Sequence, residues 1–179
     1  MGKPSEPKPV QLFVGLLTGY PDYAPKVREE LEERFGEVGR ESSFIPFDYT
    51  DYYSGEMGEG LVKKFFVFHD LIQPDELPRI KLKTNGIELA LAEEVEAEVR
   101  RPVNIDPGYV GLSKIVLATT KNYSHRIYLE RGIYAEVTLQ YRDGEFRPQP
   151  WTYPDYRSEK YLEFFEEVRD LYVRRPELA

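Results

Sequence analysis

Between residues 103 and 142 the sequence breaks into short runs in which apolar and polar side chains alternate. The runs cover residues 114–121, 125–130 and 133–142, with Gly132 and Asp143-Gly144 at their ends. Alternation with a period of two is typical of strands, and these glycines favour tight hairpin turns. Because short turns join only antiparallel neighbours, the stretch predicts an antiparallel meander. Any fold assigned to the chain has to contain it.

The order of the other elements determines the fold class. The sequence predicts a strand at 10–17, a helix at 24–35 ending at Gly36, extended residues at 37–47, an irregular loop at 48–60, a strand at 61–72, a helix from 74 to 99 and a last helix after Ser158. Strands and helices do not alternate strictly, as they would in a doubly wound parallel fold. We therefore predict an α+β fold, a mainly antiparallel sheet with helices packed on one face. A ferredoxin-like core with added strands is the leading interpretation.

Residues 104–108 are predicted to form a turn. Pro107 followed by Gly108 fits a type II geometry, and Asp106 is a residue that commonly precedes such a pair. Asp106 is also a secondary candidate for a functional carboxylate.

Length and composition limit the class of protein. The 179 residues fit one domain, residues 1–179, with residues 1–9 as a flexible N-terminal lead. An apolar content of 41% with 14% aromatic residues is typical of a globular chain. The sequence contains neither an apolar run long enough for a membrane span nor a secretory signal, so a cytoplasmic location is expected. Abundant Glu, Lys, Arg and Pro with few Asn, Gln and Met predict a heat-adapted protein.

Charge and cysteine content argue against several functions. Without cysteine the chain can form no disulfide, no thiolate metal site and no cysteine nucleophile. The net charge of −8 argues against non-specific binding to nucleic acid or to an anionic membrane, because positive charge makes the first contact with both. The sequence also lacks the signatures of P-loop hydrolases, dinucleotide-binding folds, zinc peptidases of the H-E-x-x-H type and serine hydrolases.

The connection at residues 119–126 concentrates polar groups at one end of the meander. Lys121 and Arg126, with the Thr119 hydroxyl, could hold a phosphate or carboxylate, and His125 could transfer a proton near neutral pH. Glu136 lies in an otherwise regular strand and is a candidate site carboxylate. The alternative is a solvated loop beside an exposed sheet face, on which such residues point to water.

Two smaller groups are also candidates. Asp48 and Asp51 lie in an aromatic-rich loop, and carboxylates suit a hard cation such as Mg²⁺. They match no known metal-loop spacing, so a turn with side-chain-to-backbone hydrogen bonds is the alternative. Lys81 and Asn85 lie four residues apart on the predicted long helix and could contact a ligand, although such a polar face is commonly just solvated.

Seven motifs spread over nearly the whole chain are shared with one known family. They are Pro9-Val10 with Leu12-Phe13-Val14-Gly15, Pro46-Phe47-Asp48-Tyr49-Thr50-Asp51-Tyr52-Tyr53, Lys81-Leu82-Lys83-Thr84-Asn85, Asn104-Ile105-Asp106-Pro107-Gly108-Tyr109, Ala118-Thr119-Thr120-Lys121, Ser124-His125-Arg126-Ile127-Tyr128 and Trp151-Thr152-Tyr153-Pro154-Asp155-Tyr156-Arg157. With these motifs the chain resembles domain-of-unknown-function family four-four-one-six, a family of uncharacterised prokaryotic proteins. The resemblance implies kinship but no established activity.

Two functional hypotheses remain open, and neither decides whether the protein is an enzyme. In the first, the polar sheet face binds a phosphorylated small molecule or nucleotide, with Mg²⁺ and with hydrolysis or transfer as further options. The residues assigned are Lys121, Arg126, Thr119, Lys81 and Asn85 for the ligand, His125, Glu136 and Asp51 for catalysis, and Asp48 and Asp51 for the metal. In the second, the chain is a non-catalytic module that binds another protein through its aromatic loops.

Overall fold

The structure is a computed structural model that describes residues 2–50, 54–94 and 97–178. In chain order its elements are β1 (Val10–Thr18), η1 (Pro21–Tyr23), α1 (Ala24–Phe35), β2 (Val38–Glu41), β3 (Ile45–Pro46), α2 (Ser54–Met57), β4 (Val62–Ile72), η3 (Pro74–Glu76), α3 (Leu77–Glu94), β5 (Val103–Val110), β6 (Lys114–Thr119), β7 (Ile127–Glu130), β8 (Ile133–Arg142), β9 (Glu145–Pro148), η4 (Asp155–Arg157), α4 (Glu159–Tyr172) and η5 (Pro176–Leu178).

The strands of the described chain form one antiparallel sheet in the order β2-β4-β1-β5-β6-β8-β7, with β3 paired to β4 and β9 paired to β8. The segment β1-α1-β2-β4-α3-β5, with strand order β2-β4-β1-β5, has the ferredoxin-like βαββαβ arrangement. Strands β6 to β9 extend the sheet beyond β5. The predicted α+β class is confirmed.

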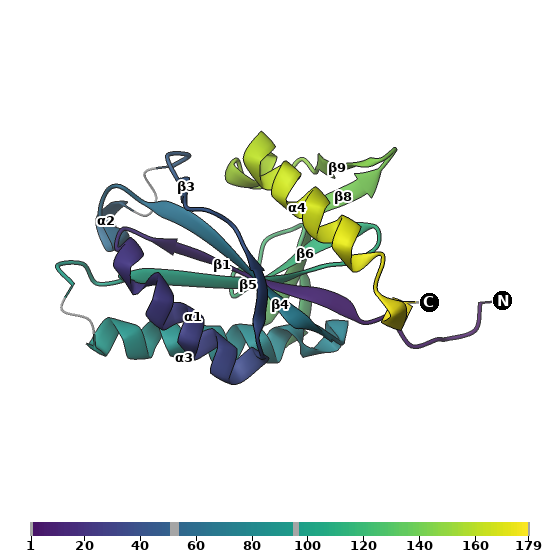
Figure 1. Ribbon diagram of the computed structural model, residues 1–179, viewed down its shortest axis with the longest axis horizontal. Helices are drawn as coiled ribbons and strands as arrows, with labels where there is room; N and C mark the ends of the chain where they lie inside the picture. Colours follow the sequence, from purple (N-terminus) through teal and green to yellow (C-terminus); the bar gives the residue numbers. More distant parts are fainter. Residues whose placement is uncertain (1, 51–53, 95–96, 179) are drawn as a thin grey trace.

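Helices cover both faces of this sheet (Figure 1). Apolar side chains of α1 and α3 pack with Leu12, Val14 and Leu16 of β1 on one face. On the other face α4 packs against Phe13 and Phe65. Because every residue of β1 is buried, each face of that strand needs an apolar cover. The expected one-sided packing holds for α1 and α3, and α4 departs from it.

The hairpin turns of the meander lie where the glycines predicted them. Arg131 and Gly132 have φ angles of 50° and 80° between β7 and β8, and Asp143 and Gly144 have φ angles of 55° and 91° between β8 and β9. Two successive positive φ values are the geometry of the type I′ turn, whose twist matches that of the flanking strands.

Three expectations from the sequence need correction. Residues 104–108 do not form a turn but lie inside β5. The long helix α3 ends at Glu94, and Val99 lies beyond it near Gly58, where a Cβ added to the glycine would be 3.3 Å from Val99 Cγ1. The irregular loop 48–60 contains the short helix α2. For residues 104–108, pairing with β1 overrides the local turn pattern.

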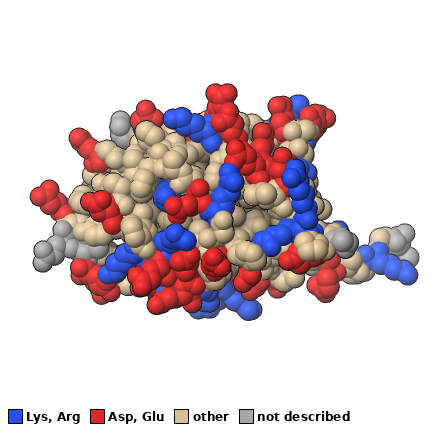
Figure 2. Space-filling view, viewed as in Figure 1, with Lys and Arg blue, Asp and Glu red and all other residues tan. Residues whose placement is uncertain are grey.

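Acidic and basic side chains are interspersed over the face shown in Figure 2, so the negative net charge is not gathered in one area there. Among the residues described, no helix has both the length and the apolar character that crossing a membrane requires.

Candidate functional site

The sheet forks between β5 and β6. Strand β6 pairs with β5 only from Gly108 opposite Leu117 to Val110 opposite Ile115, whereas β1 pairs with all eight residues of β5. Gly108 lies where the two strands meet. A Cβ at this position would lie 2.6 Å from both Phe13 Cζ and the Val116 carbonyl oxygen, so only glycine allows this close approach. On the side of β5 away from β1, residues 103–107 therefore face the fork and not β6.

Side chains of α3 bind both backbone groups of Ile105, which the fork leaves without a strand partner. The Ile105 N–H donates to Glu88 Oε1 at 2.7 Å, and the Ile105 carbonyl accepts from Lys81 Nζ at 3.0 Å. These two groups thus point away from β1. In a strand, the backbone groups of every second residue point to the same side. An N–H at position 107 would therefore also point away from β1, and Pro107 has none. Proline is tolerated inside this strand for that reason, which explains why the turn prediction was wrong.

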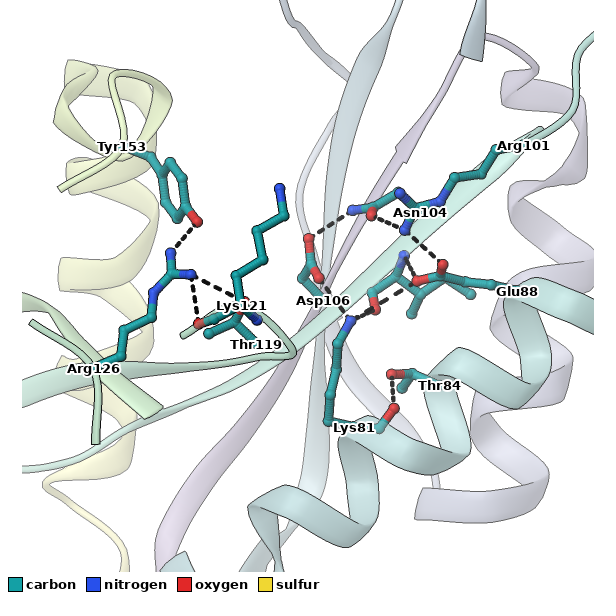
Figure 3. Close-up of polar contacts among 11 residues, drawn as sticks. Lys81, Thr84, Glu88, Arg101, Asn104, Asp106, Thr119, Lys121, Arg126 and Tyr153 are labelled. Atoms are coloured by element: carbon teal, nitrogen blue, oxygen red, sulfur yellow. Dashed lines mark hydrogen bonds and ion pairs between the residues drawn. The ribbon is translucent and has the colours of Figure 1, made fainter. Parts of the chain in front are cut away.

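A pocket of about 410 Å³ lies in the fork. We call it the fork pocket; Figure 3 shows the polar groups on its two sides, Asp106 and Asn104 on β5 opposite Thr119, Lys121 and Tyr153. Its lining residues are Leu17, Phe47, Tyr49, Thr50, Lys63, Asn104, Asp106, Leu117, Ala118, Thr119, Lys121, Tyr123, Glu136, Tyr153, Pro154, Asp155 and Tyr156. An aromatic and aliphatic lining with a few polar groups is typical of small-molecule sites.

Lys63 of β4 reaches the fork pocket across the neighbouring strand β1. Gly15 lies between Phe65 and Asp106 in the paired strands, and its missing side chain leaves the space that Lys63 occupies. Lys63 is only 4% exposed, and its ammonium makes no hydrogen bond or ion pair with any described residue. The ammonium nitrogen is not among the fully buried unpartnered atoms, so it is accessible from the fork pocket.

Asp106 is an ionised carboxylate fixed at the floor of the fork pocket. Its Oδ1 accepts from Lys81 Nζ at 2.8 Å, and its Oδ2 accepts from Asn104 Nδ2 at 2.6 Å. Burial alone would raise the pKa of Asp106, but the charges of Lys81 and Lys63 and the two hydrogen bonds outweigh burial and lower the pKa well below its ordinary value.

Asp155 and Tyr156 of η4 are two further buried polar groups in the fork pocket. Burial raises the pKa of Asp155, and attraction by Lys63 and hydrogen bonds from backbone N–H groups offset part of this rise. The Tyr156 hydroxyl is buried and has no hydrogen-bond partner among the described residues. Burial raises the pKa of Tyr156 well above its usual value, and the charge of Asp155 is the second cause of this rise. The hydroxyl is therefore protonated near neutral pH.

Arg126 holds the opposite wall of the fork pocket together. Its Nε donates to Glu136 Oε2 at 2.7 Å, and one terminal nitrogen donates to the Lys121 carbonyl at 3.0 Å. The other terminal nitrogen donates to the Tyr153 hydroxyl at 2.5 Å, and the guanidinium carbon lies 4.5 Å from the centre of the Tyr123 ring. Most donors of this guanidinium are thus used within the protein, and Arg126 positions Tyr153 and Tyr123.

Glu136 is buried at 2% exposure, so the interpretation that it lies on a solvated sheet face is wrong. The 149–156 segment covers this face, with Trp151 Nε1 donating to the Val137 carbonyl and Thr152 Oγ1 to the Thr138 carbonyl. His125 Nε2 lies 3.2 Å from Glu136 Oε2, and the His125 ring stacks on Trp151 at 5.3 Å between ring centres.

The family model described as a domain of unknown function (DUF4416) matches residues 8–172. The chain belongs to the DUF4416 family. This confirms the resemblance seen in the seven motifs. No curated protein and no solved structure shows significant similarity to this DUF4416 chain.

The structure of the DUF4416 chain brings some of the predicted site residues together. Thr119, Lys121 and Glu136 line the fork pocket. Lys81, Arg126 and His125 are not among its described lining residues, but each contacts a residue that is. Asn85 on α3 and the exposed Asp48 lie outside this lining, and Asp51 lies outside the described residues. The binding and catalytic roles assigned to these residues stay predictions.

The metal prediction gains no support from clustering. In residues 2–50, 54–94 and 97–178, no group of three or more His, Asp or Glu side chains could hold a metal ion. Because the site proposed for Mg²⁺ includes Asp51, it stays a prediction.

Sequence reasoning missed Lys63 and Asp155 and treated Asp106 as secondary. One signal was available for Lys63, which occupies a position on the same side of its strand as Leu61, Phe65 and Val67. A lysine among inward-facing apolar residues indicates a buried charge with a specific purpose.

Proposed function

We propose that the fork pocket binds a phosphorylated small molecule or a nucleotide. The observation that carries this proposal is Lys63, a residue only 4% exposed whose ammonium opens into the fork pocket and makes no hydrogen bond or ion pair with the described residues. A phosphate group would supply both the charge and the acceptors that this ammonium lacks.

The charges around the fork pocket favour an anion if the two close ion pairs are each counted as neutral. Lys81 pairs with Asp106 at 2.8 Å, and Arg126 pairs with Glu136 at 2.7 Å. Lys63 belongs to neither pair, and Asp155, whose pKa is raised by burial and lowered in part by Lys63, is a further carboxylate that acts on it. A bound phosphate would therefore meet a cation without displacing either close ion pair.

The aromatic wall suits a flat ring. Tyr49, Tyr123 and Tyr153 line the fork pocket, and Arg126 fixes two of these rings. Aromatic side chains bind planar heterocycles by stacking, and a volume of about 410 Å³ falls within the roughly 300–1,000 Å³ of typical ligand pockets.

Thermal-shift and calorimetric titrations with nucleotides, sugar phosphates and phenyl phosphate, each with and without Mg²⁺, test the proposal. We expect at least one of these compounds to raise the melting temperature of the wild type, since a ligand that binds only the folded state stabilises it. Lys63→Met should remove this shift while keeping the fold, because methionine fills a similar volume without a charge.

Lys64→Met is the matched control. Lys64 is the next residue of β4, points to the other face of the sheet and pairs with Glu41 at 3.1 Å. This variant should bind as the wild type does. If no phosphate compound shifts the wild type, or if Lys63→Met binds equally well, the proposal is wrong.

A second candidate, a protein-interaction module, is favoured by the outer edge of the sheet. In β7 the side chains of Ile127 and Tyr128 are 71% and 57% exposed, and exposed apolar residues on an edge strand favour contact with another chain. Sedimentation of the wild type and of Ile127→Lys tests this role for self-association. Concentration-dependent assembly that the substitution abolishes would support it, and a monomeric wild type would contradict it.

A further inference from the structure

Asp106 offers the fork pocket a fixed acceptor of hydrogen bonds. An ionised carboxylate can accept about four hydrogen bonds, and only the two from Lys81 and Asn104 come from the described residues. The Asp106 side chain is 32% exposed, whereas that of Lys81 beneath it is 5% exposed. Because Asp106 lines the fork pocket, its accessible part faces a bound ligand.

The position of Asp106 is set from several sides. Arg101 donates to the Asn104 side chain and to Glu88 Oε2, the latter at 2.7 Å, while Lys81 holds both the Ile105 carbonyl and Asp106. Side chains held in this way keep their geometry when a ligand arrives, which is a requirement for discriminating between similar ligands.

A carboxylate that stays ionised limits what can bind beside it. It repels phosphate oxygens, so the phosphate belongs at Lys63 and not at Asp106. A cationic amine would meet the ammonium groups of Lys63 and Lys81, whose charges both act on Asp106. Neutral donors remain, and hydroxyl groups are the neutral donors that accompany a phosphate in sugar phosphates and nucleotides.

We propose that the ligand of the fork pocket is a ribose phosphate or ribonucleotide whose sugar hydroxyls donate to Asp106. This inference rests on the proposed function. Asp106 is then the residue that determines specificity for hydroxylated ligands. A carboxylate that accepts from ribose hydroxyls is a recurring solution in nucleotide sites.

Paired ligands that differ only in their hydroxyl groups test this inference. The four ribonucleoside 5′-monophosphates and their 2′,3′-dideoxy analogues are titrated calorimetrically into the wild type and into Asp106→Asn. We expect the wild type to bind at least one ribonucleotide about tenfold more tightly than its dideoxy analogue, because the analogue leaves a polar group of the site unpaired. Asp106→Asn should reduce this ratio to near one while binding the dideoxy analogue as the wild type does.

The ratio of two affinities measured on one sample does not depend on the fraction of folded protein, so partial destabilisation of Asp106→Asn does not obscure the result. Equal binding of both members of every pair, or a preference that survives in Asp106→Asn, would overturn the inference and leave the proposed phosphate site standing. Absence of binding by every ribonucleotide, every analogue and every sugar phosphate would overturn the inference, and the proposed phosphate site would fail with it only if phenyl phosphate also left the wild type unshifted.

Discussion

A Cβ added to Gly15 would lie 2.8 Å from Cε of Lys63 and 3.1 Å from its Nζ. The two residues lie on neighbouring strands, and the lysine side chain runs over the glycine toward the fork pocket. Phe65 Cε1 would lie 3.1 Å from the same Cβ, so the close approach of Lys63 and Phe65 explains why a glycine lies in the middle of this buried strand.

Gly15→Ala should therefore displace Lys63. Overpacking in a buried strand costs about 1–3 kcal/mol of unfolding free energy, and phosphate binding should weaken as well. Urea denaturation measures the first effect and calorimetry the second. Gly86→Ala is the control, because a Cβ on Gly86 in α3 meets nothing within 4 Å. That change should stabilise the protein by about 0.5–1 kcal/mol, and equal destabilisation by both changes would contradict this account.

Lys81→Met should lower the unfolding free energy by about 3 kcal/mol, because it leaves the Asp106 carboxylate without its hydrogen-bonded counter-charge and the Ile105 carbonyl unpaired. Lys83→Met, on an exposed position of the same helix, should change it by less than about 0.5 kcal/mol. Chemical denaturation of the two variants compares them directly, and similar stabilities would show that the contacts of Lys81 add little.

Glu136→Gln should destabilise the fold by about 3 kcal/mol, since the buried Arg126 guanidinium loses its counter-charge. The near-ultraviolet circular dichroism signal of Trp151 and Tyr153 should also change, because Arg126 and His125 position these rings. Glu145→Gln, which removes only an exposed ion pair to Arg147, should cost less than about 1 kcal/mol. An unchanged spectrum for Glu136→Gln would argue against this positioning role.

Asp155 should make the protein less stable as the pH rises. Its pKa in the folded state lies above the ordinary value of 3.8, with burial as the main cause. Between these two values the folded chain holds a proton that the unfolded chain has released, so stability falls as pH increases through this window. Asp155→Asn removes this loss, so the unfolding free energy of the variant should rise relative to that of the wild type as the pH increases above about 4. Asp170→Asn, on the exposed side of α4, should show no such gain; a parallel gain in both variants would contradict the assignment.

Elements with a local cause could be predicted from the sequence. The helix α1 has Val27, Leu31 and Phe35 at four-residue spacing and stops at Gly36, and it begins and ends where the pattern indicates. The turns at Gly132 and Gly144 follow from a backbone geometry that glycine adopts easily. In both cases the deciding interaction lies within a few residues of the chain.

The fork pocket could not be predicted because its causes are distant in sequence. Pro107 and Gly108 carry a strong local turn signal, yet pairing with β1 and the side chains of α3 hold them in a strand. Likewise the position of Lys63 depends on Gly15 and on a strand pairing that no local pattern specifies. The polar residues of 119–126 were recognised as a group, but which of them face the fork pocket depends on how the 149–156 segment covers the sheet.

Glu88 and Lys81 have a consequence for solubility as well. A gap in a sheet normally exposes backbone groups that can recruit a strand from another molecule and start aggregation. Here the N–H and carbonyl of Ile105 are already occupied by these two side chains, and Pro107 has no N–H to offer. At these two positions the opening in the sheet therefore offers another strand no free backbone N–H to pair with.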